Sequence, residues 1–212
     1  RLCFTPPEDA PEVSSTPALS NNFVTFGCFQ RLPKITDETL RSWSRILESC
    51  KDSRLRIQSE GLDQEPQKDD FLERAALLGI PKTRLELAGK EPRADYLARH
   101  AEIDIILDCF PFSGGATTCE ALWMGVPTVT LAGATLVSRQ GASLLSAAGL
   151  DDWVATTAEG FVELAIEKAS DLHSLEELRA TLREQVLSSP LYDGERFANH
   201  LADALHGMWD AR

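Results

Sequence analysis

The chain contains 212 residues, 43% of them hydrophobic, which is enough for one well-packed core in a single domain. Its 33 acidic and 21 basic residues leave a net charge of −12, which argues against binding to nucleic acid or to an anionic membrane surface. The five cysteines are too widely spaced for a zinc site or a small disulfide scaffold. No apolar run approaches the roughly 20 residues that span a bilayer. We therefore expect a cytoplasmic protein that holds no metal and does not bind membranes.

Proline-rich residues 1–21 are typical of an extended connector, and Arg1 in place of Met leads us to expect a piece of a longer polypeptide. Hydrophobic patterns then predict, in order, a strand at 23–27, a helix from 36, a strand at 54–58, a loop at 60–69, a helix at 70–78, a strand at 84–87 and a helix at 93–99. The second half predicts a buried strand at 103–107, a helix at 118–124, a strand at 128–131, a helix at 137–148, a weak strand at 153–155, and helices at 158–170, 174–187 and 196–208. This alternation predicts an α/β fold, a Rossmann-like parallel sheet with helices on both faces and a helical C-terminal tail, with ligands at the carboxyl ends of the strands.

The turn after the buried strand at 103–107 carries the strongest chemical signal. Gly114 and Gly115 precede a helix that opens on Thr117 and Thr118, an arrangement that aims unpaired backbone N–H groups at an anion, most simply a phosphate. Glu120, one turn further along, could reach a hydroxyl beside that phosphate. Two alternatives involve no ligand: Thr117 and Glu120 have the spacing of a capping box, and the glycines could permit a turn with positive φ.

Lys34 follows a strand that ends in Gly27, so it is expected at the carboxyl edge of the sheet. The alternative is a solvated loop lysine. No spacing groups the four histidines as metal ligands, although His100 precedes the strand that leads to the turn and could line a pocket there.

Five blocks of sequence carry a family resemblance: 26–35, 103–108, 114–127, 189–191 and 208–209. Together they resemble the protein O-GlcNAc transferase family, in its bacterial and SPINDLY-like branch. The resemblance implies the C-terminal half of the catalytic region of a B-type glycosyltransferase. It divides the chain into a connector from a missing N-terminal half (1–21), a nucleotide-sugar-binding domain (22–190) and a C-terminal helix that packs on the missing half (191–212).

The resemblance also implies roles for individual residues. Lys34, the one catalytic candidate, would contact the pyrophosphate of a UDP-sugar, as a point charge on a flexible stem can. Gln30 or Arg31 would face the same phosphates. Glu120 would accept hydrogen bonds from the ribose hydroxyls. The remaining implied donor-binding residues are Tyr96 and Arg99, near the base, and Gly114, Gly115, Ala116, Thr117 and Thr118, at the phosphate turn.

The implied activity is transfer of N-acetylglucosamine from UDP-N-acetylglucosamine to Ser or Thr of intracellular proteins. The lysine and the helix start would stabilise the leaving UDP, so that no metal or other cofactor is needed. Protein acceptors would bind through repeats upstream of the missing half, and this fragment alone would bind UDP without transferring sugar. Two alternatives stay open: a nucleotide-binding interaction module without catalysis, and a B-type glycosyltransferase that uses another donor, such as GDP-fucose, or an acceptor that is not a protein.

Overall fold

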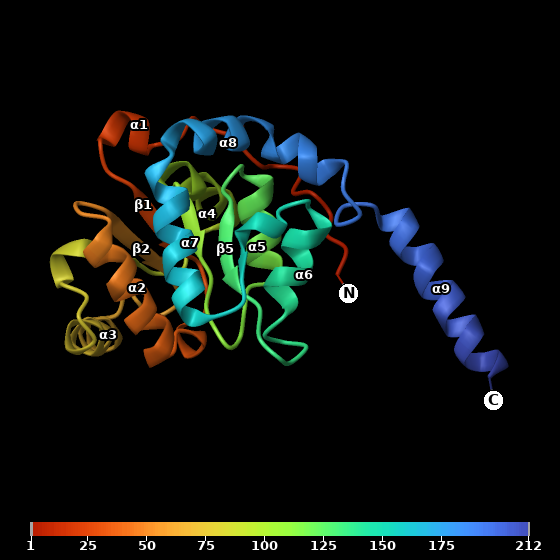
Figure 1. The fold of residues 1–212 in the computed structure, drawn as a ribbon, viewed down its shortest axis with the longest axis horizontal. Coiled ribbons are helices and arrows are strands. Elements are labelled where there is room, and N and C mark those ends of the chain that lie inside the picture. Colours follow the sequence, from red (N-terminus) through yellow and green to blue (C-terminus); the bar gives the residue numbers. More distant parts are fainter. Residues whose placement is uncertain (1, 212) are drawn as a thin grey trace.

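A computed structural model describes residues 2–211 and contains the expected parallel sheet (Figure 1). Its six strands lie in the order β3-β2-β1-β4-β5-β6, and every neighbouring pair is parallel. The strands are β1 (Thr25–Cys28), β2 (Arg54–Gln58), β3 (Leu85–Ala88), β4 (Ile105–Leu107), β5 (Thr128–Leu131) and β6 (Val154–Ala155). Because β1 and β4 are adjacent at the centre, the loops that follow them meet at one edge of the sheet.

Helices cover both faces of the sheet. They are α1 (Ala18–Asn21), α2 (Asp37–Ser49), α3 (Glu65–Leu77), α4 (Arg93–Ala98), α5 (Ala116–Trp123), α6 (Gln140–Ala147), α7 (Ala158–Ser170), α8 (Leu172–Leu187) and α9 (Gly194–Asp210). Side chains of β4 alternate between the faces. Leu107 packs in the larger core with Trp43 of α2 and Phe161 of α7, whereas Ile106 packs with Ala121 of α5 and Tyr96 of α4.

The sequence patterns located β2, β5 and α7 with their observed bounds. The expected loop at 60–69 ends at Gln64, so the prediction was wrong for residues 65–69, where α3 has already begun. Pro66 lies in its first turn, where the missing N–H costs nothing, and the polar run around it offers no apolar periodicity. Helix α6 begins three residues later than expected. Thr135 and Ser138 bond to each other there and form a separate turn.

The N-terminal segment before α1 lies against α8. Arg179 of α8 is 1% exposed, and its guanidinium donates hydrogen bonds to the backbone oxygens of Ser14, His100 and Ile103. Arg183 likewise donates to the backbone oxygen of Pro11. Residues 2–17 are therefore fixed to the domain although they form no helix or strand.

Helix α9 extends away from the body of the domain (Figure 1). None of its residues is buried, and it carries four exposed large apolar side chains, Leu201, Leu205, Met208 and Trp209. Its charged and apolar side chains separate on the helix surface, as in a helix that buries one face against another element.

Candidate functional site

Two neighbouring cavities lie at the carboxyl edge of the sheet, around the loop that follows β1. The first, which we call the Lys34 cavity, has a volume of about 320 Å³ and is lined by Phe29, Gln30, Arg31, Lys34, Phe112, Gly115, Ala116, Thr117 and Gln140. The second, the Tyr96 cavity, has a volume of about 380 Å³ and is lined by Phe29, Gln30, Arg31, Gln58, Ser59, Glu60, Lys90, Glu91, Arg93 and Tyr96. The first three residues are shared, so the two cavities adjoin.

Lys34 ends a short 3-10 helix, Leu32–Lys34, and its ammonium group points to the turn after β4. Nζ donates to Gln30 Oε1 over 3.0 Å and to the backbone oxygen of Ser113 over 3.2 Å, and it lies 4.0 Å from the centroid of the Phe112 ring. Burial lowers the pKa of Lys34, while the nearby carboxyl of Asp108 acts in the opposite direction. Lys34 is therefore a positioned cation at the cavity and not a freely solvated lysine.

Gln30 connects Lys34 to the start of α5. Its Nε2 donates to Thr117 Oγ1 over 2.6 Å while its Oε1 accepts from Lys34. No side-chain hydrogen bond caps α5, whose N-cap residue is Gly115. The capping-box alternative was wrong, because Thr117 lies inside the first turn and bonds to Gln30, and Glu120 bonds elsewhere. The positive end of the helix dipole thus faces the same cavity as the ammonium group.

The paired glycines allow close approach and are not needed for backbone reversal. Neither has a positive φ, so that alternative was also wrong. A Cβ on Gly114 would lie 2.2 Å from Thr118 Oγ1 and 2.6 Å from Gln30 Nε2, and one on Gly115 would lie 2.4 Å from Gln140 Nε2. Any larger residue at Gly114 would therefore displace the side chains that form the cavity.

Asp108, directly after β4, holds the turn that contains Gly114 in place through hydrogen bonds. Its Oδ1 accepts from the backbone N–H groups of Gly114 and Cys109 over 2.7 and 2.8 Å, and its Oδ2 accepts from Thr130 Oγ1 over 2.7 Å. Burial raises the pKa of Asp108 to about 6, while these hydrogen bonds and Lys34 act in the opposite direction.

Glu120, on α5, is buried and has partners at both carboxylate oxygens. Arg93 Nη1 forms an ion pair with Oε1, and the Tyr96 hydroxyl donates to Oε2 over 2.7 Å. Burial, followed by the charge of Glu120, raises the pKa of Tyr96 well above its ordinary value. Tyr96 therefore remains a hydrogen-bond donor, and α4 and α5 are connected beside the Tyr96 cavity.

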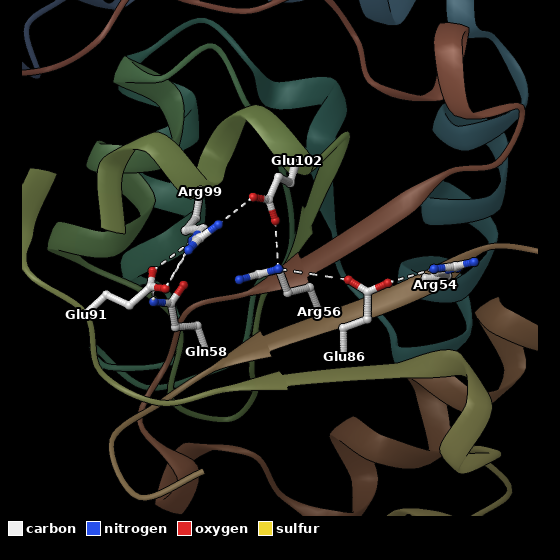
Figure 2. Close-up of polar contacts among 7 residues, drawn as sticks. All are labelled: Arg54, Arg56, Gln58, Glu86, Glu91, Arg99 and Glu102. Carbon is white, nitrogen blue, oxygen red and sulfur yellow. Dashed lines mark hydrogen bonds and ion pairs between the residues drawn. The ribbon is translucent and has the colours of Figure 1, made fainter. Parts of the chain in front are cut away.

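The structure brings most of the expected site residues together at the two cavities, but four of them line neither cavity: Gly114, whose backbone lies next to Gly115 in the turn, and Arg99, Thr118 and Glu120. Arg99 lines neither cavity, because its guanidinium is held by Glu91 and Glu102 (Figure 2). Thr118 is 1% exposed, and its hydroxyl lies behind Gly114. Glu120 is adjacent to the Tyr96 cavity but is covered by Arg93 and Tyr96.

Several residues of the site were missed in the sequence. Asp108 and Gln58 end or follow buried strands, and that position at the sheet edge was an available signal. Phe112, Gln140 and Glu91 reach the cavities from separate loops or helices, and nothing local to them predicts it.

Among residues 2–211, no group of three or more His, Cys, Asp or Glu side chains is arranged to hold a metal ion. No helix in that range is long and apolar enough to cross a membrane.

Comparisons with known proteins lead to one family of sequences. Residues 13–201 match the sequence profile of Glycosyl transferase family 41. A probable UDP-N-acetylglucosamine-peptide N-acetylglucosaminyltransferase SPINDLY from Hordeum vulgare is 42% identical over 209 residues, which cover 98% of this chain and 22% of that protein. This chain thus corresponds to less than a quarter of that relative.

Solved structures of glycosyltransferases share this fold. A Thermobaculum terrenum O-GlcNAc transferase mutant superposes with a TM-score of 0.89 at 38% identity, covering 97% of this chain and 39% of that one. WaaG, a glycosyltransferase of lipopolysaccharide biosynthesis, superposes with a TM-score of 0.64 at 15% identity, covering 93% of this chain and 54% of that one. The second likeness concerns the fold alone.

Proposed function

The chain belongs to glycosyl transferase family 41, and from this membership we propose that it is the donor-binding part of a protein O-glycosyltransferase. The substrate would be UDP-N-acetylglucosamine, the donor in the name of the Hordeum vulgare relative, and the sugar would pass to Ser or Thr of other intracellular proteins. One observation carries the proposal: an ammonium group, an amide side chain and an uncapped helix start converge on the Lys34 cavity.

The diphosphate of the donor occupies the Lys34 cavity in this proposal. When the acceptor hydroxyl oxygen attacks the anomeric carbon, the bond from that carbon to the β-phosphate oxygen breaks and the electron pair leaves with UDP. The hydroxyl proton passes to a base in the rest of the polypeptide. Negative charge then grows on the β-phosphate, where Lys34 and the amide groups at the start of α5 stabilise it. Gln30 holds Lys34 Nζ and Thr117 Oγ1 in place before the donor arrives, so little reorganisation is required.

The nucleoside occupies the adjoining Tyr96 cavity. The ribose hydroxyls bind Glu120 after Arg93 or Tyr96 releases one of its oxygens, and the rings of Phe29 and Tyr96 flank the base. Arg99 contributes by holding Glu91 at the cavity wall. Gln30 and Arg31, which line both cavities, lie where the nucleoside meets the diphosphate.

The parent protein would supply the remaining parts. The relative from Hordeum vulgare is several times longer than this chain, so the acceptor site and the other catalytic half are assigned to the rest of the polypeptide. Helix α9 presents exposed Leu201, Leu205 and Met208 for packing on that half. Residues 22–190 would then be the donor-binding domain, and this part alone would bind UDP but transfer little sugar.

Calorimetry with UDP tests the proposal. Lys34→Ala should weaken UDP binding at least about tenfold, which corresponds to roughly 1.4 kcal/mol. Lys51→Ala removes the same charge from an exposed position just after α2 and should leave the affinity unchanged. Equal affinities for UDP in the unchanged protein and in the Lys34 variant would remove Lys34 from the mechanism.

A further inference from the structure

Gln58 has a buried hydrogen-bond acceptor that no residue of the described chain uses. It is the last residue of β2, it is 5% exposed, and it lines the Tyr96 cavity. Its Nε2 donates to Glu91 Oε2 over 2.9 Å, whereas its Oε1 is buried and has no partner within residues 2–211. A buried amide oxygen without a donor is costly, so a ligand that supplies an N–H would be favoured here.

The orientation of the Gln58 amide is fixed by its neighbour. Reversing the amide would place Oε1 against the carboxylate of Glu91, where two acceptors repel. Hydrogen bonds from Arg99 are the main cause that lowers the pKa of Glu91, so this carboxylate is ionised and can only accept. The amide nitrogen therefore faces Glu91, and the amide oxygen is left for another donor.

A chain of ion pairs holds Glu91 in this position (Figure 2). Two guanidinium nitrogens of Arg99 bond to the Glu91 carboxylate over 2.9 to 3.1 Å, and Arg99 also pairs with Glu102. The series continues through Arg56 and Glu86 to Arg54 along the sheet. The acceptor of Gln58 is thus positioned by a network and does not depend on one contact.

We propose that Gln58 Oε1 accepts the ring N–H of the donor nucleobase, which makes Gln58 a specificity-determining residue. Uracil carries this donor at N3 and guanine carries it at N1, whereas the matching ring nitrogens of cytosine and adenine are acceptors. The latter two bases would place a lone pair against the amide oxygen, and buried polar groups left unpaired in this way discriminate strongly. This inference rests on the proposed donor-binding function.

The base must displace side chains to reach the amide oxygen, because that atom is shielded from water in the free protein. Glu60 and Lys90 are exposed residues that line the same cavity. Their movement admits the base edge to Gln58, while Phe29 and Tyr96 flank the ring.

The test compares calorimetric affinities of the 212-residue chain for UDP, GDP, CDP and ADP. UDP or GDP should bind at least tenfold more tightly than CDP and ADP. Gln58→Leu keeps a branched side chain of similar size and removes the whole amide, including the acceptor, so it should weaken binding of the preferred nucleotide at least tenfold. It should leave the affinity for CDP within threefold of that of the unchanged protein. Gln67→Leu, at an exposed position on α3, serves as the matched control and should change neither affinity.

A chemical probe makes the result independent of folding of the variant. UDP methylated at N3 and GDP methylated at N1 lack the ring N–H, and each should bind the unchanged protein at least tenfold more weakly than its parent. If Gln58→Leu weakens the affinity for all four nucleotides by the same factor, Gln58 has a structural role and the inference is overturned. Full affinity of the unchanged protein for the methylated nucleotides would overturn it as well. If none of the nucleotides binds the unchanged protein, the donor-binding function itself fails; if they bind without preference, only the role of Gln58 fails.

Discussion

The Tyr96 hydroxyl donates a hydrogen bond to Glu120 Oε2 over 2.7 Å, joining α4 to α5 beside the proposed nucleoside pocket. Arg93 pairs with the other oxygen of the same carboxylate. Glu120 is only 6% exposed, because Arg93 and the Tyr96 hydroxyl cover its carboxylate in the free protein. A ribose diol can reach Glu120 only if one of these side chains moves aside, and it then competes with that side chain for the carboxylate.

This competition predicts effects of opposite sign for two substitutions. Glu120→Ala removes the acceptor for the ribose hydroxyls and should weaken the affinity for UDP at least about tenfold, since hydrogen bonds to charged groups contribute about 1.5–3 kcal/mol. Tyr96→Phe removes a hydroxyl that competes with the ribose for Glu120. It should raise the affinity for UDP about two- to tenfold, since a typical hydrogen bond contributes about 0.5–1.5 kcal/mol. Calorimetry measures both affinities.

Inorganic pyrophosphate separates ribose binding from general damage to the site. Neither substitution should weaken the binding of pyrophosphate, which has no ribose to contact Glu120. Glu163→Ala, at an exposed position on α7, controls for the loss of a negative charge. A loss of UDP affinity in Tyr96→Phe as large as in Glu120→Ala would show that the two side chains act as one unit, contrary to this prediction.

Gly114→Ala should disrupt the turn through a steric clash. The new Cβ would lie 2.2 Å from Thr118 Oγ1, on a β-branched side chain with little rotamer freedom, and 2.6 Å from Gln30 Nε2. Overpacking of this kind costs about 1–3 kcal/mol, and it moves Gln30 away from Thr117 and Lys34. Thermal unfolding should show a lower melting temperature, and calorimetry should show UDP affinity reduced at least tenfold.

Gly207→Ala is the matched control for this substitution. A Cβ at Gly207 meets no atom within 4 Å, and the residue lies inside α9, where alanine is favoured over glycine by about 1 kcal/mol. The control should leave UDP affinity unchanged and should not lower the melting temperature. If Gly114→Ala behaves in the same way, the turn tolerates a side chain and close packing does not define it.

The sequence was most informative where the signal is local. The apolar run before Asp108, the two glycines and the following threonines predicted a strand, a turn and a helix start, because each depends on residues a few positions apart. The position of Lys34 followed from the end of β1 in the same way. The bounds of α3 were missed since its first turn is polar, and only its packing shows that it is helical.

Partners far apart in the sequence could not be predicted from it. Thr117 and Glu120 match a capping box, yet Gln30, 87 residues before Thr117, takes its hydroxyl, and α4 takes Glu120. Such choices depend on which strands lie side by side, and local spacing carries no record of that.

From the burial of His100 we expect the free energy of unfolding to fall in acid. Its ring is buried against Phe29 and Tyr96, and burial lowers the pKa of His100 from 6.5 to about 4. Between these values the unfolded chain binds a proton that the folded protein does not, so the free energy of unfolding falls as pH falls from about 6.5 to about 4.

His100→Phe keeps an aromatic ring and binds no proton in either state. Its free energy of unfolding, measured with urea at pH 7 and pH 5, should fall by about 2 kcal/mol less than that of the unchanged protein, at 1.36 kcal/mol per pH unit. Every other titrating group is common to the two proteins and cancels in the comparison. An equal fall in both would mean that folded His100 titrates at its ordinary pKa.

For Asp108 we expect the free energy of unfolding to change with pH in the opposite direction, over nearly the same range of pH. Burial raises the pKa of Asp108 from 3.8 to about 6, so between these values the folded protein holds a proton that the unfolded chain has released. The free energy of unfolding contributed by this group therefore falls as pH rises from about 4 to about 6 and is constant above that. In the unchanged protein this slope partly cancels that of His100.

Asp108→Asn removes the titrating carboxyl, so the loss of unfolding free energy that His100 causes on acidification is no longer offset. On acidification from pH 6 to pH 4.5 the variant should lose about 2 kcal/mol more unfolding free energy than the unchanged protein, from 1.36 kcal/mol per pH unit over that interval. Urea unfolding at several pH values, with circular dichroism to verify the fold at each, measures the difference. Parallel curves for the two proteins would mean that the Asp108 carboxyl is ionised in the folded state throughout, held so by Lys34 and the turn amides against the cost of burial.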